Sequence, residues 1–354
     1  MTPDLVLDLT DRRPTAGARP SRPSARGPLS RVLFAWWDGR SDGAEVEPAA
    51  RTARHLAGID PLVDDDLHLA LWACYQLHYG GLAGVDDDLE WDPATLGFRA
   101  RLEAAFEGAL RAEHDAAALP ADAVAALEEL RTWAGPPLAR TVEEEGTLDH
   151  LREFAVHRSA YQLKEADPHT FGLPRLRGPG RAAMVEIQAD EYGDGVPGEA
   201  HCELFAAAMD ELGLSSDEAA YVGQLPGVTL ATDNLVSMFG LHRRLRGALV
   251  GHLALFEMCS VVPMGRYLAA ARRIGGLPAL ERFYRVHVEV DEHHARLALD
   301  GMVRPMVAAA PELGPDVVLG AAALSRAEAR LAAHLLRSWD AGTSSLRTPL
   351  ARTA

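Results

Sequence analysis

Cysteine is scarce in this sequence of 354 residues. The three cysteines, Cys74, Cys202 and Cys259, stand far apart and form no Cys-x-x-Cys pair. This spacing argues against a disulfide framework and against a zinc ribbon, because both use numerous or closely paired cysteines. Free thiols suit a reducing compartment, so we expect a cytoplasmic protein.

Positive charge is also in deficit, since 35 Lys and Arg residues face 51 Asp and Glu residues and the formal net charge is −16. Proteins that bind nucleic acid or an anionic membrane usually present a basic surface, so we expect neither partner. We find no apolar run of the length that spans a bilayer. Arg12-Arg13 lacks the apolar core that a twin-arginine export signal needs. The expected partner is therefore a small-molecule substrate.

Strand-like patterns are few as well, and most of the chain shows the helical pattern of apolar residues three and four apart, with Ala, Leu, Glu and Arg enriched. The expected helices are 66–80, 96–113, 121–134, 147–166, 180–192, 198–212, 229–239, 244–260, 277–299 and 318–339. Turn-forming residues predict breaks at Asp167-Pro168, Gly178–Gly180, Gly193–Gly198, Pro226-Gly227, Pro263 and Gly275-Gly276. The fold class is therefore predicted to be all-α.

Composition divides the chain into four predicted parts. Residues 1–28 are rich in Pro, Ala, Arg and Ser and are expected to be a disordered tail. Residues 29–140 form a helical N-terminal extension without a convincing set of ligands. Residues 141–340 form the main domain, and residues 341–354 form a C-terminal tail.

The expected helix 277–299 carries the strongest functional signal. His287, Asp291 and His294 stand at i, i+4 and i+7, which places them in one stripe of a helix face. Phe283 and Ala298 continue this stripe, so the face is expected to be buried. A buried carboxylate is costly unless it is paired or binds a metal, and neutral imidazole is a common metal ligand. The stripe predicts a metal site; an exposed polar helix with incidental histidines is the alternative.

Four further residues are candidate ligands: Glu165, Glu191, His201 and Glu257. Glu165 and Glu257 lie near the ends of two expected helices, where a glutamate like Glu257 is as often a surface residue and one like Glu165 is more often a surface residue. Glu191 ends one helix and His201 opens the next, because the glycines between them require a turn, so both can face the same interior point. Three nearby carboxylates compete with Glu191, and the sequence leaves a swap open: Glu186, Asp190 and Glu199.

Together the candidate ligands balance the charge of two divalent cations, since four carboxylates match four positive charges and the three imidazoles can be neutral. Oxygen-rich ligation with histidine suits iron or manganese, whereas structural zinc favours cysteine. Ferritin-like dimetal bundles use Glu-x-x-His pairs from two helices, and the candidate positions do not follow that pattern. We therefore predict a different kind of dimetal centre, held by Glu165, Glu191, His201, Glu257, His287, Asp291 and His294.

This pattern resembles the haem-oxygenase-like diiron oxidases and oxygenases. That family has a Glu on one core helix, a Glu and a His around the next, an additional Glu in some members, and His-x3-Asp-x2-His on a third. Glu165 matches the first position, Glu191 and His201 the second, and Glu257 the additional carboxylate. His287, Asp291 and His294 match the third. The stretch from Glu186 to Gly193 also resembles the second core helix, and the resemblance covers roughly residues 145–340.

The resemblance implies a seven-helix all-α bundle, here with an additional helical N-terminal region. It implies a cofactor of two Fe(II) ions, for which manganese is a potential substitute, and dioxygen as co-substrate. The expected reaction oxidises an amine or amino acid, by N-oxygenation or by oxidative C–C or C–H cleavage, in a natural-product biosynthetic pathway. We also expect a homodimer and allow for an external electron donor.

Three alternatives stay open: a cofactor-independent oxidase or hydrolase of the same fold, a haem oxygenase, and a non-catalytic iron-binding protein. The substrate itself is not identified by the sequence. Six residues are candidates to contact a substrate carboxylate, although each residue type is more often structural or exposed: Arg158, Arg243, Arg244, Arg246, Tyr161 and Trp72.

Overall fold

The computed structural model describes residues 19–39, 49–115 and 117–350. Within these ranges the only β-pairing is an isolated bridge between Ser21 and Ala83, so the predicted all-α class is confirmed. The longer helices are α1 (Pro28–Trp37), α2 (Ala49–Leu56), α3 (Asp65–Gln76), α4 (Pro93–Asp115), α5 (Ala123–Arg131), α6 (Leu138–Glu145), α7 (Leu148–Gln162), α9 (Gly178–Glu191), α10 (His201–Glu211), α11 (Gly227–Leu241), α12 (Arg246–Ile274), α13 (Pro278–Arg296) and α15 (Gly314–Asp340). Shorter segments are α8 (Asp167–Thr170), α14 (Arg304–Ala309), the 3-10 turns η1 (Asp87–Glu90), η2 (Leu173–Arg175), η3 (Gly193–Gly195), η4 (Arg243–Leu245) and η6 (Pro311–Leu313), and the π-helical η5 (Leu297–Val303).

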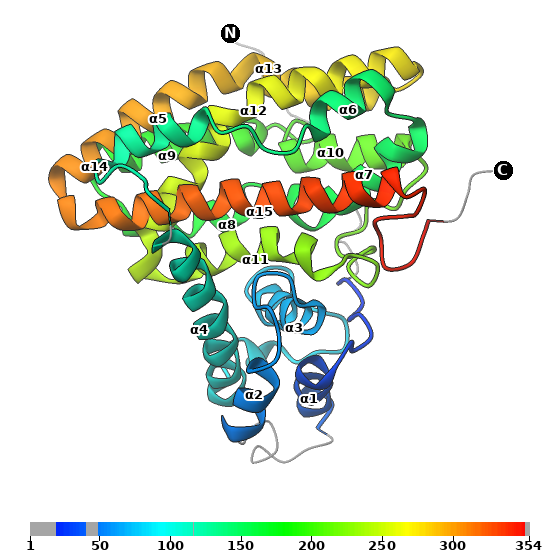
Figure 1. Cartoon of the computed structure of the whole chain (residues 1–354), viewed down its shortest axis with the longest axis vertical. Helices are drawn as coiled ribbons and strands as arrows, with labels where there is room; N and C mark the ends of the chain where they lie inside the picture. The colour runs from blue at the N-terminus through cyan, green and yellow to red at the C-terminus, as the bar shows by residue number, and fades with distance from the viewer. Residues whose placement is uncertain (1–18, 40–48, 116, 351–354) are drawn as a thin grey trace, which may run out of the picture.

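The long helix α12 packs along both α13 and α15, and these three helices form the frame of a large bundle. In Figure 1 the bundle occupies one end of the molecule, α1–α3 lie at the other end, and α4 runs between them. One continuous hydrophobic core joins both regions, because it includes Leu33 of α1, Leu71 of α3, Phe98 of α4 and Phe283 of α13. The N-terminal helices therefore share their core with the bundle.

The helical pattern predicted most elements but not every boundary. Each expected helix overlaps an observed α-helix, whereas α1, α2, α6, α8 and α14 were not expected. The break predicted at Pro263 is wrong, because Pro263 lies inside α12. Proline in a helix interior costs about 3 kcal/mol, and the burial of α12 against α13 and α15 on both sides of this position offsets that cost.

Helix α12 also corrects our expectation about apolar runs. The stretch Arg243–Ile274 is long and apolar enough to cross a membrane by length and composition. However, 67% of its most apolar window is buried inside the described structure, which is the behaviour of a core helix.

Both predicted tails include residues that contact the body. Arg19 binds Asp87 at 2.6 and 2.8 Å, and Arg26 donates to the Val222 carbonyl at 2.6 Å. At the other end, Ser344 donates to Glu153 at 2.7 Å. Residues 1–18 and 351–354 lie outside the described residues, and the division into domains stays a prediction.

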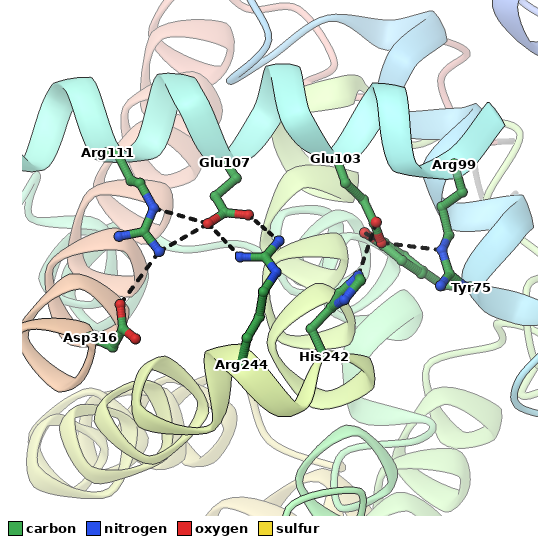
Figure 2. A network of polar contacts seen from close by, with 8 residues as sticks. All are labelled: Tyr75, Arg99, Glu103, Glu107, Arg111, His242, Arg244 and Asp316. Carbon is green, nitrogen blue, oxygen red and sulfur yellow. Dashed lines mark hydrogen bonds and ion pairs between the residues drawn. The ribbon is translucent and has the colours of Figure 1, made fainter. Parts of the chain in front are cut away.

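Helix α4 attaches to the bundle through a row of charged side chains, shown with their partners in Figure 2. Glu107 accepts hydrogen bonds from Arg244 at 2.8 and 2.5 Å and from Arg111 at 2.9 Å. Glu103 lies one turn earlier and contacts His242 at 2.9 Å. Arg244, which we considered as a substrate contact, is therefore engaged in holding α4.

Helices α12 and α15 cross at two glycines. A Cβ atom on Gly251 would collide with the carbonyl oxygen of Val317, and one on Gly320 would collide with the carbonyl oxygen of Ala248. Glycine at these two positions lets the backbones approach closely. This contact fixes the position of α12, which carries the predicted ligand Glu257.

We predict that Gly320→Ala destabilises the fold by about 1–3 kcal/mol, because overpacking forces the two helices apart. Gly265→Ala is the matched control: Gly265 lies in α12, and a Cβ there meets no atom within 4 Å. That control should be neutral or stabilising by up to ~1 kcal/mol, since alanine favours the helix. Urea unfolding followed by circular dichroism measures both, and equal stability of the two variants would contradict the close crossing.

Candidate metal centre

The predicted ligands come from helices and turns that converge inside the bundle. Glu165 lies between α7 and α8, Glu191 is the last residue of α9, and His201 is the first residue of α10, as expected. Glu257 lies in α12, and the predicted stripe of α13 holds the other three. Each side chain is buried, with exposed fractions from 0 to 8%: Glu165, Glu191, His201, Glu257, His287, Asp291 and His294.

The segment that carries Glu165 is held by neighbours on both sides. Lys164, the only lysine in the sequence, binds Asp233 of α11 at 2.8 and 2.9 Å in a buried ion pair. Gln188 of α9 donates to the carbonyl of Ala166 at 2.8 Å. These contacts fix the backbone next to Glu165, so its side chain has a defined direction.

Glu165, His201 and His287 form a first group, in which one ligand atom from each lies within 4.8 Å of the others. His287 Nδ1 lies 2.8 Å from the Phe283 carbonyl, to which it donates, so in the neutral ring the lone pair is on Nε2. That Nε2 lies 3.7 Å from Glu165 Oε2. The rings of His201 and His287 lie side by side, with their centroids 4.3 Å apart.

Glu191, Glu257 and His294 form a second group under the same 4.8 Å limit. His294 Nδ1 faces Glu257 Oε2 at 3.4 Å and Asp291 Oδ1 at 4.0 Å. Glu191 Oε2 also lies 2.8 Å from Nδ1 of His201, a member of the first group. Glu191 therefore lies between the two groups, and Asp291 lies beside the second.

Several polar atoms of these residues are buried and have no hydrogen-bond partner. Six such atoms belong to the predicted ligands: Glu165 Oε2, Glu191 Oε2, His201 Nδ1, His287 Nε2, Asp291 Oδ2 and His294 Nδ1. Buried polar groups in proteins nearly always have hydrogen-bond partners, so this many unpaired oxygen and nitrogen atoms in one place require an explanation. A void of about 10 Å³, the size that holds one water-sized particle, lies among members of both groups. This donor set fits two small divalent cations.

The competing carboxylates point elsewhere. Glu186 is exposed and pairs with His293 at 2.9 Å, and Glu199 pairs with Arg282 at 2.5 Å. Asp190 contacts the outer nitrogen of His294, with its Oδ2 2.8 Å from Nε2. Of the four carboxylates in this region, the structure therefore directs only Glu191 into the interior.

Sequence reasoning missed several residues around the ligands. The void is also lined by His169, Gln188 and Phe256, and by Tyr161, which we considered only as a substrate contact. His169 lies in α8, where we had predicted a break, so no periodic pattern marked it. Burial lowers the pKa of His169 to about 3, so this imidazole stays neutral.

The charges of the ligands are strongly coupled when no metal ion separates them. Burial lowers the pKa of His287, but the hydrogen bond and charge of Glu165 outweigh burial and raise it to about 10. In the same way, Glu257 and Asp190 outweigh burial at His294 and raise its pKa to about 9. Burial, followed by the charge of Glu257, raises the pKa of Asp291 to about 6.

The chain is similar to known proteins in three separate comparisons. A family model described as an iron-containing redox enzyme matches residues 152–329, which include all the predicted ligands. A nitrosourea synthase from Streptomyces achromogenes subsp. streptozoticus is 28% identical over 159 residues, which are 45% of this chain and 34% of that protein. A crystal structure of a CADD-like protein of unknown function from Nostoc punctiforme aligns with 60% of this chain and 94% of its own, at 15% identity and a TM-score of 0.47. The chain thus matches about a third of the length of its curated relative.

We predict that metal binding releases protons. At pH 7 His287 and His294 are protonated in the metal-free chain, because their pKa values are raised to about 10 and about 9, and coordination requires the neutral form. Adding Mn(II) to the metal-free protein in weak buffer with an indicator dye should release about two protons per chain, and fewer above pH 9. Metal binding at pH 7 without proton release would contradict this charge assignment.

The raised pKa values of His287 and His294 also make the stability of the metal-free fold depend on pH. Both histidines have folded pKa values above the unfolded value of about 6.5, so their ion pairs stabilise the fold fully below that pH. This stabilisation is lost as the pH rises through about 9 and about 10. Thermal unfolding of the metal-free chain between pH 7 and 10.5 should show the decline.

We predict that Asp190→Asn weakens metal binding by about 10–100-fold, because Asp190 holds the ring of His294 with Nδ1 toward the second group. Glu186→Gln is the matched control, since Glu186 also lies in α9 but pairs with the exposed His293. Competition with a chelator, followed by the electron paramagnetic resonance of free Mn(II), measures both affinities. Equal affinities would show that Asp190 does not position His294.

Proposed function

Because the chain belongs to the family of iron-containing redox enzymes, we propose that it is a non-haem diiron enzyme that uses dioxygen to oxidise a small organic substrate. The observation that supports this most directly is the convergence of unpaired, buried carboxylate and imidazole atoms into two adjacent groups. Carboxylates with imidazoles are a donor set that suits iron. The family match and the nitrosourea synthase relative both support an oxidoreductase.

In this proposal each group of ligands holds one iron ion. Glu165, His201 and His287 hold the first, and Glu191, Glu257 and His294 hold the second. Two bound Fe(II) ions would supply the electrons that reduce dioxygen. Asp291 lies 4.0 Å from His294 and adds a fourth carboxylate, so the ligand charges balance two divalent cations when the three imidazoles are neutral.

The surrounding residues control water and protons at the centre. Leu253, Phe256 and Tyr161 line the small void and leave it too small for bulk solvent. In such a site, uncompensated charge is costly, so the protons that His287 and His294 carry without metal must leave when the ions bind. The Asp190 carboxylate, which is partly exposed, keeps His294 in the orientation that leaves Nδ1 free for coordination.

The substrate is proposed at the level of an amine or amino acid in a biosynthetic pathway. The relative that supports this is named for making a nitrosourea, a compound with an oxidised nitrogen atom, and the match covers 34% of that protein. An external electron donor, manganese as a substitute metal, a homodimer and a cytoplasmic location stay predictions from the resemblance.

The decisive experiment loads the full chain anaerobically with Fe(II) and screens amino acids, amines and fatty acids for acceleration of dioxygen consumption. We expect two iron ions per chain and consumption that depends on one substrate class. His287→Ala should lower the iron content and abolish this consumption, because it removes a ligand atom from the first group. His293→Ala changes the exposed histidine of the same helix and should leave both intact.

The alternatives give different results in the same experiment. Two bound iron ions with dioxygen consumption that no organic compound accelerates would favour an iron-binding protein. Substrate turnover without iron would favour a cofactor-independent oxidase or hydrolase. A Soret band after addition of haem, with turnover of haem, would favour a haem oxygenase.

A further inference from the structure

A second and larger cavity lies next to the metal centre. Its volume is about 550 Å³, within the range of about 300–1,000 Å³ that is usual for small-molecule sites. Its walls come from the connection between α5 and α6 and from α7, α12, α13 and α15. Phe256 lines both this cavity and the small void among the ligands. Ser260 also lines it and donates a hydrogen bond to the carbonyl oxygen of the predicted ligand Glu257 at 3.1 Å, so the cavity reaches the edge of the metal centre.

Two ion pairs border this cavity. Arg131 pairs with Glu128 at 2.8 Å, and both side chains are well exposed, so the charge in the more buried part comes from Arg158 and Glu328. Arg158 of α7 donates to both oxygens of Glu328 of α15, at 2.8 and 2.6 Å. The two side chains are only 17% and 28% exposed. A guanidinium group has five N–H donors and a carboxylate has about four acceptor positions, so both partners keep free positions. The pair thus presents one positive and one negative group side by side, with no net charge.

Three further polar side chains line the cavity without hydrogen-bond partners among the described residues. Gln162 is 5% exposed, and Tyr267 and Tyr284 are 6% and 4% exposed. The rings of Phe154, Tyr267 and Tyr284 follow one another in tilted contacts, with centroids 4.7 Å apart for Phe154 and Tyr267 and 5.5 Å for Tyr267 and Tyr284. Because these polar groups line the cavity and bond to no neighbouring residue, they are available to a polar ligand.

We propose that this cavity binds the substrate and that the substrate is a free amino acid in its zwitterionic form. The carboxylate would lie against Arg158 and the ammonium group against Glu328, while the amino-acid side chain extends along the apolar wall of α12 toward Phe256. This assignment rests on the proposed function, because it takes the metal centre to be where the substrate reacts.

The charge balance of the cavity is the reason for preferring a zwitterion. A fatty acid would meet an arginine that Glu328 already neutralises, and it would leave one net negative charge in a largely buried space. A simple amine would leave one net positive charge there. Uncompensated charge in such a site is costly, whereas a zwitterion matches both groups and adds no net charge.

Binding is measured separately from oxidation, by equilibrium dialysis with the Mn(II)-loaded full chain. The probes are the twenty common L-amino acids, and each one that binds is compared with its decarboxylated amine and its deaminated acid. We expect at least one amino acid to bind about tenfold or more tightly than both of its analogues, because each analogue leaves one charged group unmatched. Absence of binding by all twenty, or equal binding of an analogue, would overturn the assignment.

Charge substitutions test the roles of the two residues. Glu328→Gln removes the negative group, so the affinity for the deaminated acid should rise about tenfold relative to that for the amino acid. Arg158→Met removes the positive group, so the affinity for the amine should rise in the same way. Glu113→Gln is the matched control: it breaks the ion pair of Glu113 with Arg330, also on α15, outside the cavity, and should leave the order of affinities unchanged. An unchanged order in Glu328→Gln and Arg158→Met would overturn the assignment.

Two variants without a change of charge test the same binding site if the charge substitutions prevent folding. Tyr284→Phe and Gln162→Met each remove one free polar group and preserve the size of the side chain. Each should weaken amino-acid binding by about fivefold or more, because a ligand hydrogen bond is lost. Wild-type affinity in both variants would contradict the assignment.

Failure of this assignment and failure of the proposed function look different. Amino-acid binding that follows the charge substitutions, without any substrate-dependent dioxygen consumption, would refute the oxygen chemistry and keep the binding site. Dioxygen consumption driven by an amine or fatty acid, unaffected by Glu328→Gln and Arg158→Met, would keep the diiron enzyme and refute the binding site.

Discussion

Many ionisable groups are buried together in one small space inside this protein, and their charges must be balanced there. Four carboxylates and three imidazoles meet inside a helical bundle, where an uncompensated charge is costly. Without metal, protons on His287 and His294 provide part of the balance, which is why their pKa values are raised. Two divalent cations would provide the same balance without those protons. The site is therefore organised around positive charge that the protein scaffold itself does not supply.

The helical frame places most of these groups, while Glu165 lies in the turn between α7 and α8. The stripe on α13 follows from helical periodicity, and the close crossing of α12 and α15 at Gly251 and Gly320 fixes the helix that carries Glu257. The same helix contributes Phe256, which lines both the small void and the larger cavity, and Ser260, which lines the larger cavity. One helix thus connects the proposed iron ligands with the proposed substrate site, and its continuation through Pro263 places Tyr267 in the wall of that site.

The sequence predicted the parts of this arrangement that depend on local spacing. Periodicity identified the face of His287, Asp291 and His294, and the glycine-rich turn placed Glu191 at the end of one helix and His201 at the start of the next. The sequence could not choose between Glu191 and Asp190, because neighbouring residues differ only in direction, which tertiary packing sets. It also could not pair Arg158 with Glu328, since these residues are 170 positions apart and meet only when α7 packs near α15. The helix break expected at Pro263 failed for the same reason, because long-range burial outweighs a local preference.

We have proposed that the buried ligands hold two iron ions in two adjacent groups. Anomalous diffraction at the iron edge, from crystals of the full chain loaded with Fe(II) without oxygen, would locate these ions. We expect two iron peaks, one bound by Glu165, His201 and His287 and the other by Glu191, Glu257 and His294. A single peak, or iron bound by other residues and not by these six, would refute the proposed diiron centre.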